Sequence, residues 1–280
     1  MVDKVLESFS DDYPQMYYSN EELKLKCLQN NLRLLDMNVR HLGTDKNYNT
    51  MLRLIEHLDR AGVVMKDKTE CTDIDKTDQG YKVKFEKNGE AKEVEAEKIV
   101  IATGRSGASF VKNICEKYGV KINANSVDIG VRVEMKDVIW REFSSKIYEP
   151  KILYRTKTFE DRTRMFCFNQ GGLVSAENNH GIITANGHSY AEKEKKTDNC
   201  NFAILSSIHF EGDFDKPTEY AENIARNMNF AGEGNIIVQR FGDLKRGRRT
   251  NAHRLGANSV IPTLSAFPGD LSIVLPYRAL

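Results

Sequence analysis

The spacing of apolar residues changes several times along the chain and predicts alternating helical and extended segments. Apolar side chains recur every three or four positions in residues 20–36 and 45–61, which predicts two amphipathic helices. Asn20 is the expected N-cap of the first helix, because its side chain can accept a hydrogen bond from the first turn. The same helical spacing is present in residues 109–118 and in residues 217–229, which begin with a proline.

Between the second and third predicted helices the apolar spacing shortens to two, which is typical of half-buried β-strands. Three such segments lie at 68–74, 81–86 and 92–96. Asn88 and Gly89 separate the last two segments, and this pair favours a tight hairpin turn because both turn positions need positive φ. The pattern therefore predicts a three-strand meander.

Residues 98–103 (KIVIAT) differ, because four apolar residues follow one another without a break. Such a run is typical of a strand that is covered on both faces. In open α/β sheets, ligands bind beyond the carboxyl ends of strands, and small residues there allow the backbone to approach a flat cofactor. Ala102, Thr103 and Gly104 are therefore the predicted cofactor-binding residues. The alternative is an ordinary buried strand that ends in a glycine turn.

From about residue 125 the chain becomes rich in short extended segments. Five predicted strands lie at 127–134, 152–154, 164–168, 172–176 and 181–185. Residues 202–207 are apolar and suit either a further strand or a helix. This half of the chain therefore predicts a β-rich unit with a mixed or antiparallel sheet.

Together these patterns predict a mixed α/β (α+β) protein with two domains, which suits a chain of 280 residues. We expect residues 1–124 to form the first domain, with the helices, the meander and the buried strand. Residues 125–265 are expected to form a β-rich second domain. Residues 266–280 are expected to be a tail that returns toward the first domain.

The composition narrows the classes of function. With 41 Lys+Arg against 40 Asp+Glu the formal net charge is +1, which argues against a protein that coats nucleic acid. Apolar residues make up 40% and charged residues 29%, which excludes disordered and collagen-like chains. No apolar run reaches the roughly 18 residues that span a bilayer, and residues 1–15 contain no apolar signal segment. We therefore expect a cytoplasmic protein without nucleic-acid or membrane partners, and the oligomeric state stays open.

The five cysteines are scattered and form no C-x-x-C pair, which predicts reduced thiols and no metal site. Residues 245–249 (KRGRR) are the one strongly basic run. A solvated loop explains this run, and a phosphate-facing loop or a contact with an acidic partner are the alternatives.

Six short stretches, in order along the chain, resemble the predicted FAD-dependent dehydrogenase family of bacteria. These stretches are residues 41–45 (HLGTD), 127–134 (VDIGVRVE), 166–167 (FC) followed by 171–174 (GGLV), 186–189 (NGHS), 199–203 (NCNFA) and 268–271 (PGDL). The succession of helix, three-strand meander and I-V-I-A-T-G also resembles FAD-dependent oxidoreductases of the two-dinucleotide-fold type.

The resemblance implies a partial FAD-binding three-layer fold in residues 1–124 and a substrate domain in residues 125–265. It also implies hydride transfer through FAD on a small organic substrate, with NAD(P) as a further candidate cofactor. The family's G-x-G-x-x-G turn has no counterpart in this sequence. Loss of three hydrogen bonds to the pyrophosphate, at about 1.5 kcal/mol each, costs about 4.5 kcal/mol or ~10³-fold in affinity.

We therefore expect this chain to be a fragment of a flavin-dependent oxidoreductase that holds FAD weakly or not at all. One alternative is a standalone small-molecule-binding module without redox activity. Another is an interaction domain whose basic run meets an acidic partner.

The candidate catalytic residues lie in the β-rich half. In a flavoenzyme, Arg132 could clamp the carboxylate of a substrate, and the alternative is a surface arginine paired with Asp128 or Glu134. Cys167 is a candidate redox thiol or an inert buried thiol. His188 is a candidate acid or base near a flavin, or a residue that caps a loop.

Three asparagines are the candidate substrate-binding residues: Asn186, Asn199 and Asn201. Asn199 and Asn201 flank a cysteine at the start of an apolar segment. They either bind substrate or satisfy backbone groups at that position.

Overall fold

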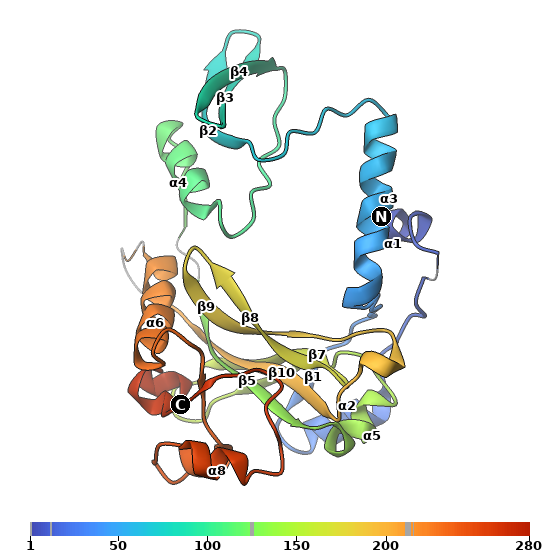
Figure 1. The fold of residues 1–280 in the computed structure, drawn as a ribbon, viewed down its shortest axis with the longest axis vertical. Helices are drawn as coiled ribbons and strands as arrows, with labels where there is room; N and C mark the ends of the chain where they lie inside the picture. The colour runs from blue at the N-terminus through green and yellow to red at the C-terminus, as the bar shows by residue number, and fades with distance from the viewer. Residues whose placement is uncertain (1, 12, 124–125, 211–213, 215) are drawn as a thin grey trace. The chain divides into compact units, whose positions relative to one another are not determined.

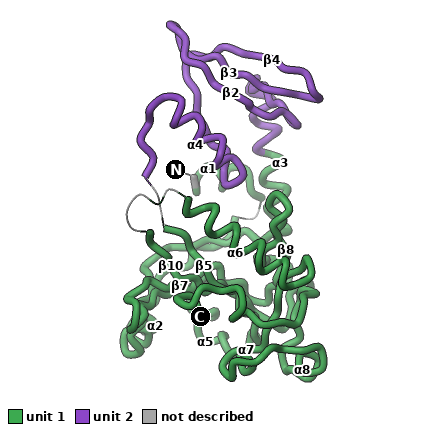
Figure 2. The backbone as a smooth tube through the Cα atoms, turned by 90° about the vertical axis from the view of Figure 1, so that its left-hand side faces the viewer, with its two compact units in different colours: residues 1–53, 124–280 green, residues 54–123 purple. Residues whose placement is uncertain are grey.

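The computed structural model describes residues 2–11, 13–123, 126–210, 214 and 216–280 (Figure 1). It shows the predicted mixture of helices and sheets. Residues 1–53 and 124–280 form one compact unit, called unit 1, and residues 54–123 form a second, called unit 2 (Figure 2). The expected first domain, residues 1–124, is therefore divided. Its first 53 residues belong with the β-rich half, because they pack against the sheet described next.

The centre of unit 1 is a five-stranded antiparallel sheet with the strand order β1-β6-β7-β10-β5. The strands are β1 (Arg33–Leu34), β5 (Val127–Lys136), β6 (Ile152–Arg155), β7 (Arg162–Asn169) and β10 (Asn199–Ile208). The predicted strands at 127–134, 152–154 and 164–168 are confirmed. Residues 202–207 form a strand rather than a helix, because β10 pairs along its whole length with β5 and also pairs with β7.

The hydrophobic core of unit 1 lies on one face of this sheet. Successive residues of a strand point to opposite faces. Cys200 and Phe202 of β10, 0% and 5% exposed, lie in the core with Leu23 and Cys27 of α2 (Glu21–Leu28). The ring of Trp140 packs edge-on against Phe202, with the ring centroids 5.3 Å apart. Helix α2 thus covers the apolar face.

The predicted helix over residues 20–36 is too long. Asn20 does cap α2, because its side chain accepts a hydrogen bond from the backbone N–H of Leu23 at 3.0 Å. The helix ends at Leu28, however, and Asn31 takes a left-handed φ of 57°. The chain then turns so that Leu34 becomes buried in β1, and strand pairing with β6 replaces the last predicted helical turns.

A hairpin of β8 (Leu173–Asn179) and β9 (Ile182–His188) contacts the other, more polar side of the sheet. Both strands confirm predicted segments. Helix α6 (Pro217–Ala231) confirms the helix predicted over 217–229 and packs along β9. Asn229 of α6 accepts a hydrogen bond from the N–H of Ile183 at 2.9 Å and donates one to its carbonyl at 2.8 Å.

The C-terminal part also belongs to unit 1. Strand β11 (Ile237–Val238) pairs in parallel with β12 (Phe267–Pro268). Near the end of the chain, Arg278 donates to both carboxylate oxygens of Asp161 at 2.5 and 2.7 Å, and Asp161 is only 7% exposed. This bidentate pair fastens the tail to the loop before β7.

The remaining helices of unit 1 are short. The α-helices are α1 (Val2–Ser8), α5 (Arg141–Ser144), α7 (Phe241–Leu244) and α8 (Ala252–Gly256). Single 3-10 turns lie at Asp137–Trp140, Lys193–Lys195, Leu271–Ile273 and Tyr277–Ala279. Helix α3 (Thr44–Arg60) confirms the helix predicted over 45–61 and passes from unit 1 into unit 2.

Unit 2 contains the predicted meander, with β2 (Glu70–Thr77), β3 (Gly80–Lys87) and β4 (Glu90–Ala96). The predicted hairpin is confirmed, because Asn88 and Gly89 have φ values of 55° and 81° between β3 and β4. Helix α4 (Ala108–Lys117) confirms the helix predicted over 109–118.

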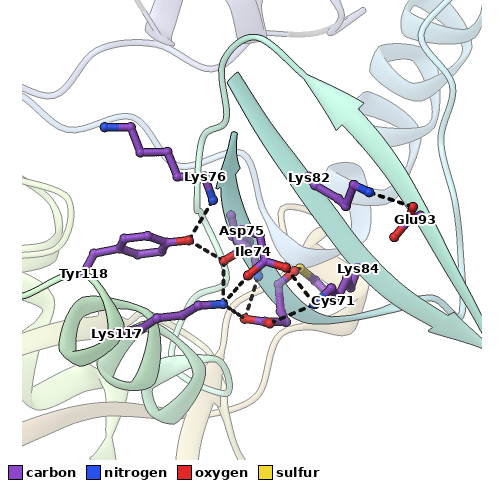
Figure 3. Close-up of polar contacts among 10 residues, drawn as sticks. Cys71, Ile74, Asp75, Lys76, Lys82, Lys84, Glu93, Lys117 and Tyr118 are labelled. Atoms are coloured by element: carbon purple, nitrogen blue, oxygen red, sulfur yellow. Dashed lines mark hydrogen bonds and ion pairs between the residues drawn. The ribbon is translucent and has the colours of Figure 1, made fainter. Parts of the chain in front are cut away.

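The side chains at the end of α4 hold this helix against β2 (Figure 3). Lys117 Nζ donates to Asp73 at 2.8 Å and to Asp75 at 2.6 Å, and the Tyr118 hydroxyl donates to the Ile74 carbonyl at 2.8 Å. Hydrogen bonds from Lys117 and then Lys84 lower the pKa of Asp75 to about 2. Polar side-chain contacts therefore help to hold α4 on β2.

The buried strand predicted over residues 98–103 is wrong. The segment has no strand pairing among the described residues, and Val100 and Ile101 are 92% and 39% exposed. A β-strand needs neighbouring strands to pair with its backbone groups, and elements packed on the sheet to bury its faces. The meander ends at β4 and provides no such neighbour for this run.

Truncation of Leu23 is expected to destabilise the protein strongly. Leu23 is 0% exposed in the core between α2 and the sheet, whereas Leu25 of the same helix is 58% exposed. We expect Leu23→Ala to lower the free energy of unfolding by about 2–5 kcal/mol, because it leaves a cavity. The matched change Leu25→Ala should cost less than about 0.5 kcal/mol. Urea unfolding followed by circular dichroism measures both, and equal losses would contradict the described core.

Candidate functional site: a buried polar layer around Arg132

A layer of polar side chains lies between the five-stranded sheet and the β8–β9 hairpin. We call it the Arg132 layer, and its members are Arg132, Glu134, Asn169, Glu177, Asn186, Asn199 and Asn201. Asn169, Asn199 and Asn201 are 5%, 4% and 0% exposed. Polar groups buried this deeply need hydrogen-bond partners, so each contact in the layer can be examined in turn.

The guanidinium of Arg132 is bound by neutral oxygens. Its Nη1 donates to Asn201 Oδ1 at 2.6 Å and to the carbonyl of Cys167 at 3.3 Å. Its Nη2 lies 3.5 Å from Asn186 Oδ1. The structure therefore contradicts the alternative of a surface arginine paired with Asp128 or Glu134.

Both of those carboxylates have other partners. Asp128 accepts hydrogen bonds from Arg164 and from the Ser207 hydroxyl. Glu134 accepts from Asn199 Nδ2 at 3.0 Å and from the Thr263 hydroxyl at 2.7 Å. Neither carboxylate forms an ion pair with Arg132.

Cys167 contributes its backbone to the layer. It has φ 54° at a β-bulge, where Cys167 and Phe168 of β7 together lie opposite Phe202 of β10. The left-handed conformation costs a non-glycine residue on the order of 1–3 kcal/mol. Here it turns the carbonyl of Cys167 toward Arg132 and toward Asn169 Nδ2, which donates to it at 2.9 Å. The residue thus acts in this layer as a hydrogen-bond acceptor.

Two buried donors in the layer have no acceptor among the described residues, namely Arg132 Nε and Asn201 Nδ2. The orientation of the Asn201 amide follows from its surroundings, because Oδ1 accepts from both Arg132 and Asn169. A buried donor without an acceptor costs about 1–3 kcal/mol. The layer therefore leaves two donors unsatisfied around Arg132, and one acceptor, Asn199 Oδ1, at its other end.

The β9 strand closes over these groups at Asn186 and Gly187. Asn186 Nδ2 donates to Glu177 at 2.8 Å, and this bond directs its Oδ1 toward Arg132 and toward the N–H of Gly187. Gly187 is required because a Cβ at this position would lie 2.2 Å from Asn201 Oδ1 and 2.5 Å from Arg132 Nη1. The hairpin backbone thus rests directly on the Arg132–Asn201 pair.

Asn199 lies at the other end of the layer and has a structural role. Its Nδ2 donates to Glu134 and to the carbonyl of Ile261 at 2.9 Å. Glu134 also accepts from the hydroxyl of Thr263, which in turn accepts from the N–H of Val174 at 2.9 Å. These bonds join the sheet, the loop around residue 263 and the hairpin, and they do not include Arg132.

His188 lies at the end of β9, where its Nδ1 is 3.4 Å from the hydroxyl of Thr44. The following residue, Ser189, accepts hydrogen bonds through its carbonyl from the N–H of Thr44 and from His41 Nε2. Burial lowers the pKa of His41, whose ring stacks on Tyr148 at 4.6 Å. Residues 41–45 therefore lie beside His188. The contact of His188 with Thr44 fits a residue that holds this loop in place.

The predicted cofactor-binding residues lie in an exposed turn and not at the end of a buried strand. Ala102, Thr103 and Gly104 are exposed and outside any strand. Gly104 has φ 63°, but no atom lies within 4 Å of the position where its Cβ would be, so its backbone faces open space. We therefore assign no step to a flavin at these residues.

The basic run, residues 245–249, contacts a buried carboxylate through Arg248. Asp243 is 1% exposed and accepts hydrogen bonds from Arg248 at 2.6 Å, Thr250 at 2.9 Å and Arg254 at 3.2 Å. Burial alone would raise the pKa of Asp243, but these hydrogen bonds outweigh it and lower the pKa to about 2. Arg248 is thus a structural member of its own loop.

Other parts of the described chain offer fewer groups for chemistry. A cavity lined by Tyr17, Tyr148 and neighbouring residues has a volume of about 20 Å³, which is room for about one water molecule. Among the described residues, no three His, Cys, Asp or Glu side chains are grouped so that they could hold a metal ion.

The sequence identified Arg132, Cys167, Asn186 and Asn201, which meet here, and Asn199 at the other end of the layer. It missed Asn169, Glu177 and Gly187. The signal for Asn169 was its place directly after the aromatic strand that contains Cys167. The alternation of Asn199 with Asn201 and of Arg132 with Glu134 is a signal that could have indicated a shared polar face.

Comparison with models of known protein families finds no match for the chain, and comparison with curated proteins finds no significant match. No helix in the described ranges is long and apolar enough to cross a membrane. The resemblance to FAD-dependent dehydrogenases therefore stays a prediction.

A methyl group at Gly187 is expected to disrupt the layer. We expect Gly187→Ala to lower the free energy of unfolding by about 1–3 kcal/mol, because its Cβ overlaps two polar atoms that cannot both move without losing their bond. The control is Gly256→Ala in α8, where nothing lies within 4 Å of the new Cβ and no loss is expected. Thermal unfolding of the two variants measures the difference. A neutral Gly187→Ala would show that the hairpin does not rest on Arg132.

Proposed function

We propose that unit 1 is a small-molecule-binding domain and that the Arg132 layer contacts the ligand. The observation that carries this proposal is that Arg132 and Asn201 keep two buried donors without an acceptor among the described residues. Buried donors without acceptors are costly, so they favour a ligand that supplies the missing acceptors.

Several other arginines of unit 1 differ from Arg132 because they pair with carboxylates. Arg40 lies 3.4 Å from Asp3, Arg164 pairs with Asp128, and Arg278 pairs with Asp161. Each of these guanidinium groups has a carboxylate within its own chain. Arg132 instead contacts two side-chain amides and one backbone carbonyl.

The position of the layer also suits binding. Its members come from β5, β7, β8, β9 and β10, which are extended elements of a hydrogen-bonded sheet and hairpin. Side chains on such elements are held more precisely than side chains on loops. Small-molecule sites also favour the space between packed layers, with a few convergent polar groups.

The test is a binding screen with a matched pair of variants. We expect at least one compound, from a set of small organic acids, amines, alcohols and amides, to raise the melting temperature of the 280-residue protein. The same compound should stabilise Arg155→Met, which changes an exposed arginine of the same sheet, and should not stabilise Arg132→Met. Equal stabilisation of both variants, or no binding compound at all, would contradict the proposal.

A second candidate function is that of the substrate domain in a flavin-dependent oxidoreductase. It is favoured by the positions of the six sequence stretches that resemble FAD-dependent dehydrogenases. Four of them, residues 127–134, 166–167, 186–189 and 199–203, are far apart in sequence and each supplies a residue to the Arg132 layer or its direct contacts. Under this proposal the parent reaction is hydride transfer through FAD on a small organic substrate, and this chain contributes substrate binding.

The second candidate predicts that the chain alone binds FAD weakly or not at all. The reason is that the exposed residues Ala102, Thr103 and Gly104 offer no cradle for a pyrophosphate. We expect the purified protein to lack the visible flavin absorbance band and to leave the fluorescence of added FAD unchanged at micromolar concentration. Stoichiometric flavin that remains after purification would contradict this expectation.

A further inference from the structure

We propose that the segment between β11 and β12 binds a short acidic peptide segment of a partner protein. Its cations, which we call the basic surface, are Arg240, Lys245, Arg246, Arg248, Arg249 and Arg254. No member of the basic surface belongs to the Arg132 layer, so this inference goes beyond the proposed small-molecule site and does not depend on it.

A buried carboxylate gathers these cations. Asp243, 1% exposed, accepts from Arg248 Nε at 2.6 Å and from Arg254 Nε at 3.2 Å, one arginine on each carboxylate oxygen. Arg254 also donates to the carbonyl of Arg249. The backbone of Arg248 is fixed as well, because its N–H donates to the Asp243 carbonyl at 3.1 Å and its carbonyl accepts from Gln239 Nε2 at 2.9 Å. The cations are therefore held in place before any partner binds, which lowers the entropic cost of binding.

The basic surface is not neutralised within its own chain. Residues 234–269 contain six Lys+Arg against a single acid, Asp243, whereas the formal net charge of the whole chain is only +1. The rest of the chain is therefore net negative. Asp270 interacts electrostatically with Arg249 and offsets it in part, but this carboxylate already accepts hydrogen bonds from Ser272 and Gln239. A positive local potential remains, and it attracts anionic groups.

The exposed cations have N–H groups left for a ligand. Arg248 uses only Nε toward Asp243, its side chain is 48% exposed, and its two Nη groups have no acceptor among the described residues. Arg246 donates to the carbonyl of Gly242 at 2.9 Å, and neither Arg246 nor Lys245 pairs with a carboxylate in the described ranges. The Nη1–Nη2 edge of Arg248 is a fork that matches the two oxygens of a carboxylate.

An exposed aromatic ring lies among the cations. Phe241, in the first turn of α7, is 74% exposed, and Lys245 Nζ lies 5.8 Å from the centroid of its ring. Arginine and aromatic residues are enriched in protein interfaces, where a few of them contribute most of the binding energy. We therefore expect the acidic segment to include an apolar side chain that packs on Phe241.

The charge distribution favours a short peptide over a nucleic-acid strand. A long polyanion extends beyond the basic surface and meets the net negative remainder of the chain, which repels it. A short run of acidic residues is matched by the basic surface alone. Arginine clusters are also a recurring means of recognising acidic motifs.

The test is fluorescence anisotropy of a labelled peptide with the full 280-residue chain. The probe is a run of glutamates with one central phenylalanine, and the comparison peptide has glutamine in place of each glutamate. We expect the acidic peptide to bind and added salt to weaken its binding, because exposed charges are screened. The glutamine peptide should bind at least about tenfold more weakly. No binding of the acidic peptide at low salt would overturn the proposal.

A triple variant tests whether the peptide binds at this surface. Lys245→Gln, Arg246→Gln and Arg249→Gln together remove three exposed charges and leave in place both arginines that pair with the buried Asp243. We expect the affinity for the acidic peptide to fall at least about tenfold.

The matched control removes the same charge from another exposed basic run. Lys193→Gln, Lys195→Gln and Lys196→Gln should change the affinity by less than about twofold, because charges far from the peptide are screened. Equal losses in the two triple variants would show that the peptide responds only to the net charge of the chain, and this result would overturn the proposal.

Carbodiimide cross-linking provides a measurement that needs no variant. The reagent joins carboxylates of the bound peptide to nearby lysine amines, and mass spectrometry locates the linkage. We expect Lys245 to be linked in preference to Lys193 and Lys195. Preferential linkage elsewhere, or a single-stranded oligothymidylate that binds more tightly than the acidic peptide and displaces it, would overturn the inference. Neither result changes the outcome of the small-molecule screen, which depends on Arg132.

Discussion

The alternation of side chains along β10 is the constraint on which the rest of unit 1 depends. Cys200 and Phe202 point into the core under α2, and Asn199 and Asn201 point into the polar layer under the hairpin. One strand therefore supplies both the apolar contacts that stabilise the fold and the amides that orient Arg132. Because successive side chains must lie on opposite faces, a shift of β10 by one residue would exchange the two environments and lose both.

Burial of the polar layer costs folding free energy, which other contacts have to offset. It buries three asparagines, leaves donors unsatisfied and includes a left-handed Cys167. The opposite face offsets this with tightly packed aromatic rings, in which Trp140 contacts Phe143, Phe168 and Phe202. Natural proteins tend to keep such local costs where a site needs them. One face of the sheet thus stabilises the fold and the other carries the unsatisfied polar groups, which supports a binding function for the polar face.

Much of the local structure could be predicted from periodicity, and much of the tertiary structure could not. The meander and α3 followed from apolar spacing and from the Asn88-Gly89 turn, which are local signals. Residues 98–103 have the composition of a buried strand, but a strand needs partners that no local pattern can supply. Likewise, only strand pairing with β6 explains why α2 ends at Leu28. Arg132 was a candidate from its place in a strand, yet its amide partners come from β9 and β10 and could not be read from β5 alone.

The contact between Asn229 and β9 has a consequence for how the molecule meets other chains. A side-chain amide offers one acceptor and donors in nearly the same geometry as a peptide group, and Asn229 bonds both the N–H and the carbonyl of Ile183 in this way. Helix α6 thereby occupies backbone groups that would otherwise template another strand. The outer edge of the hairpin is thus shielded at that point against intermolecular β-pairing, the route by which exposed strand edges lead to aggregation.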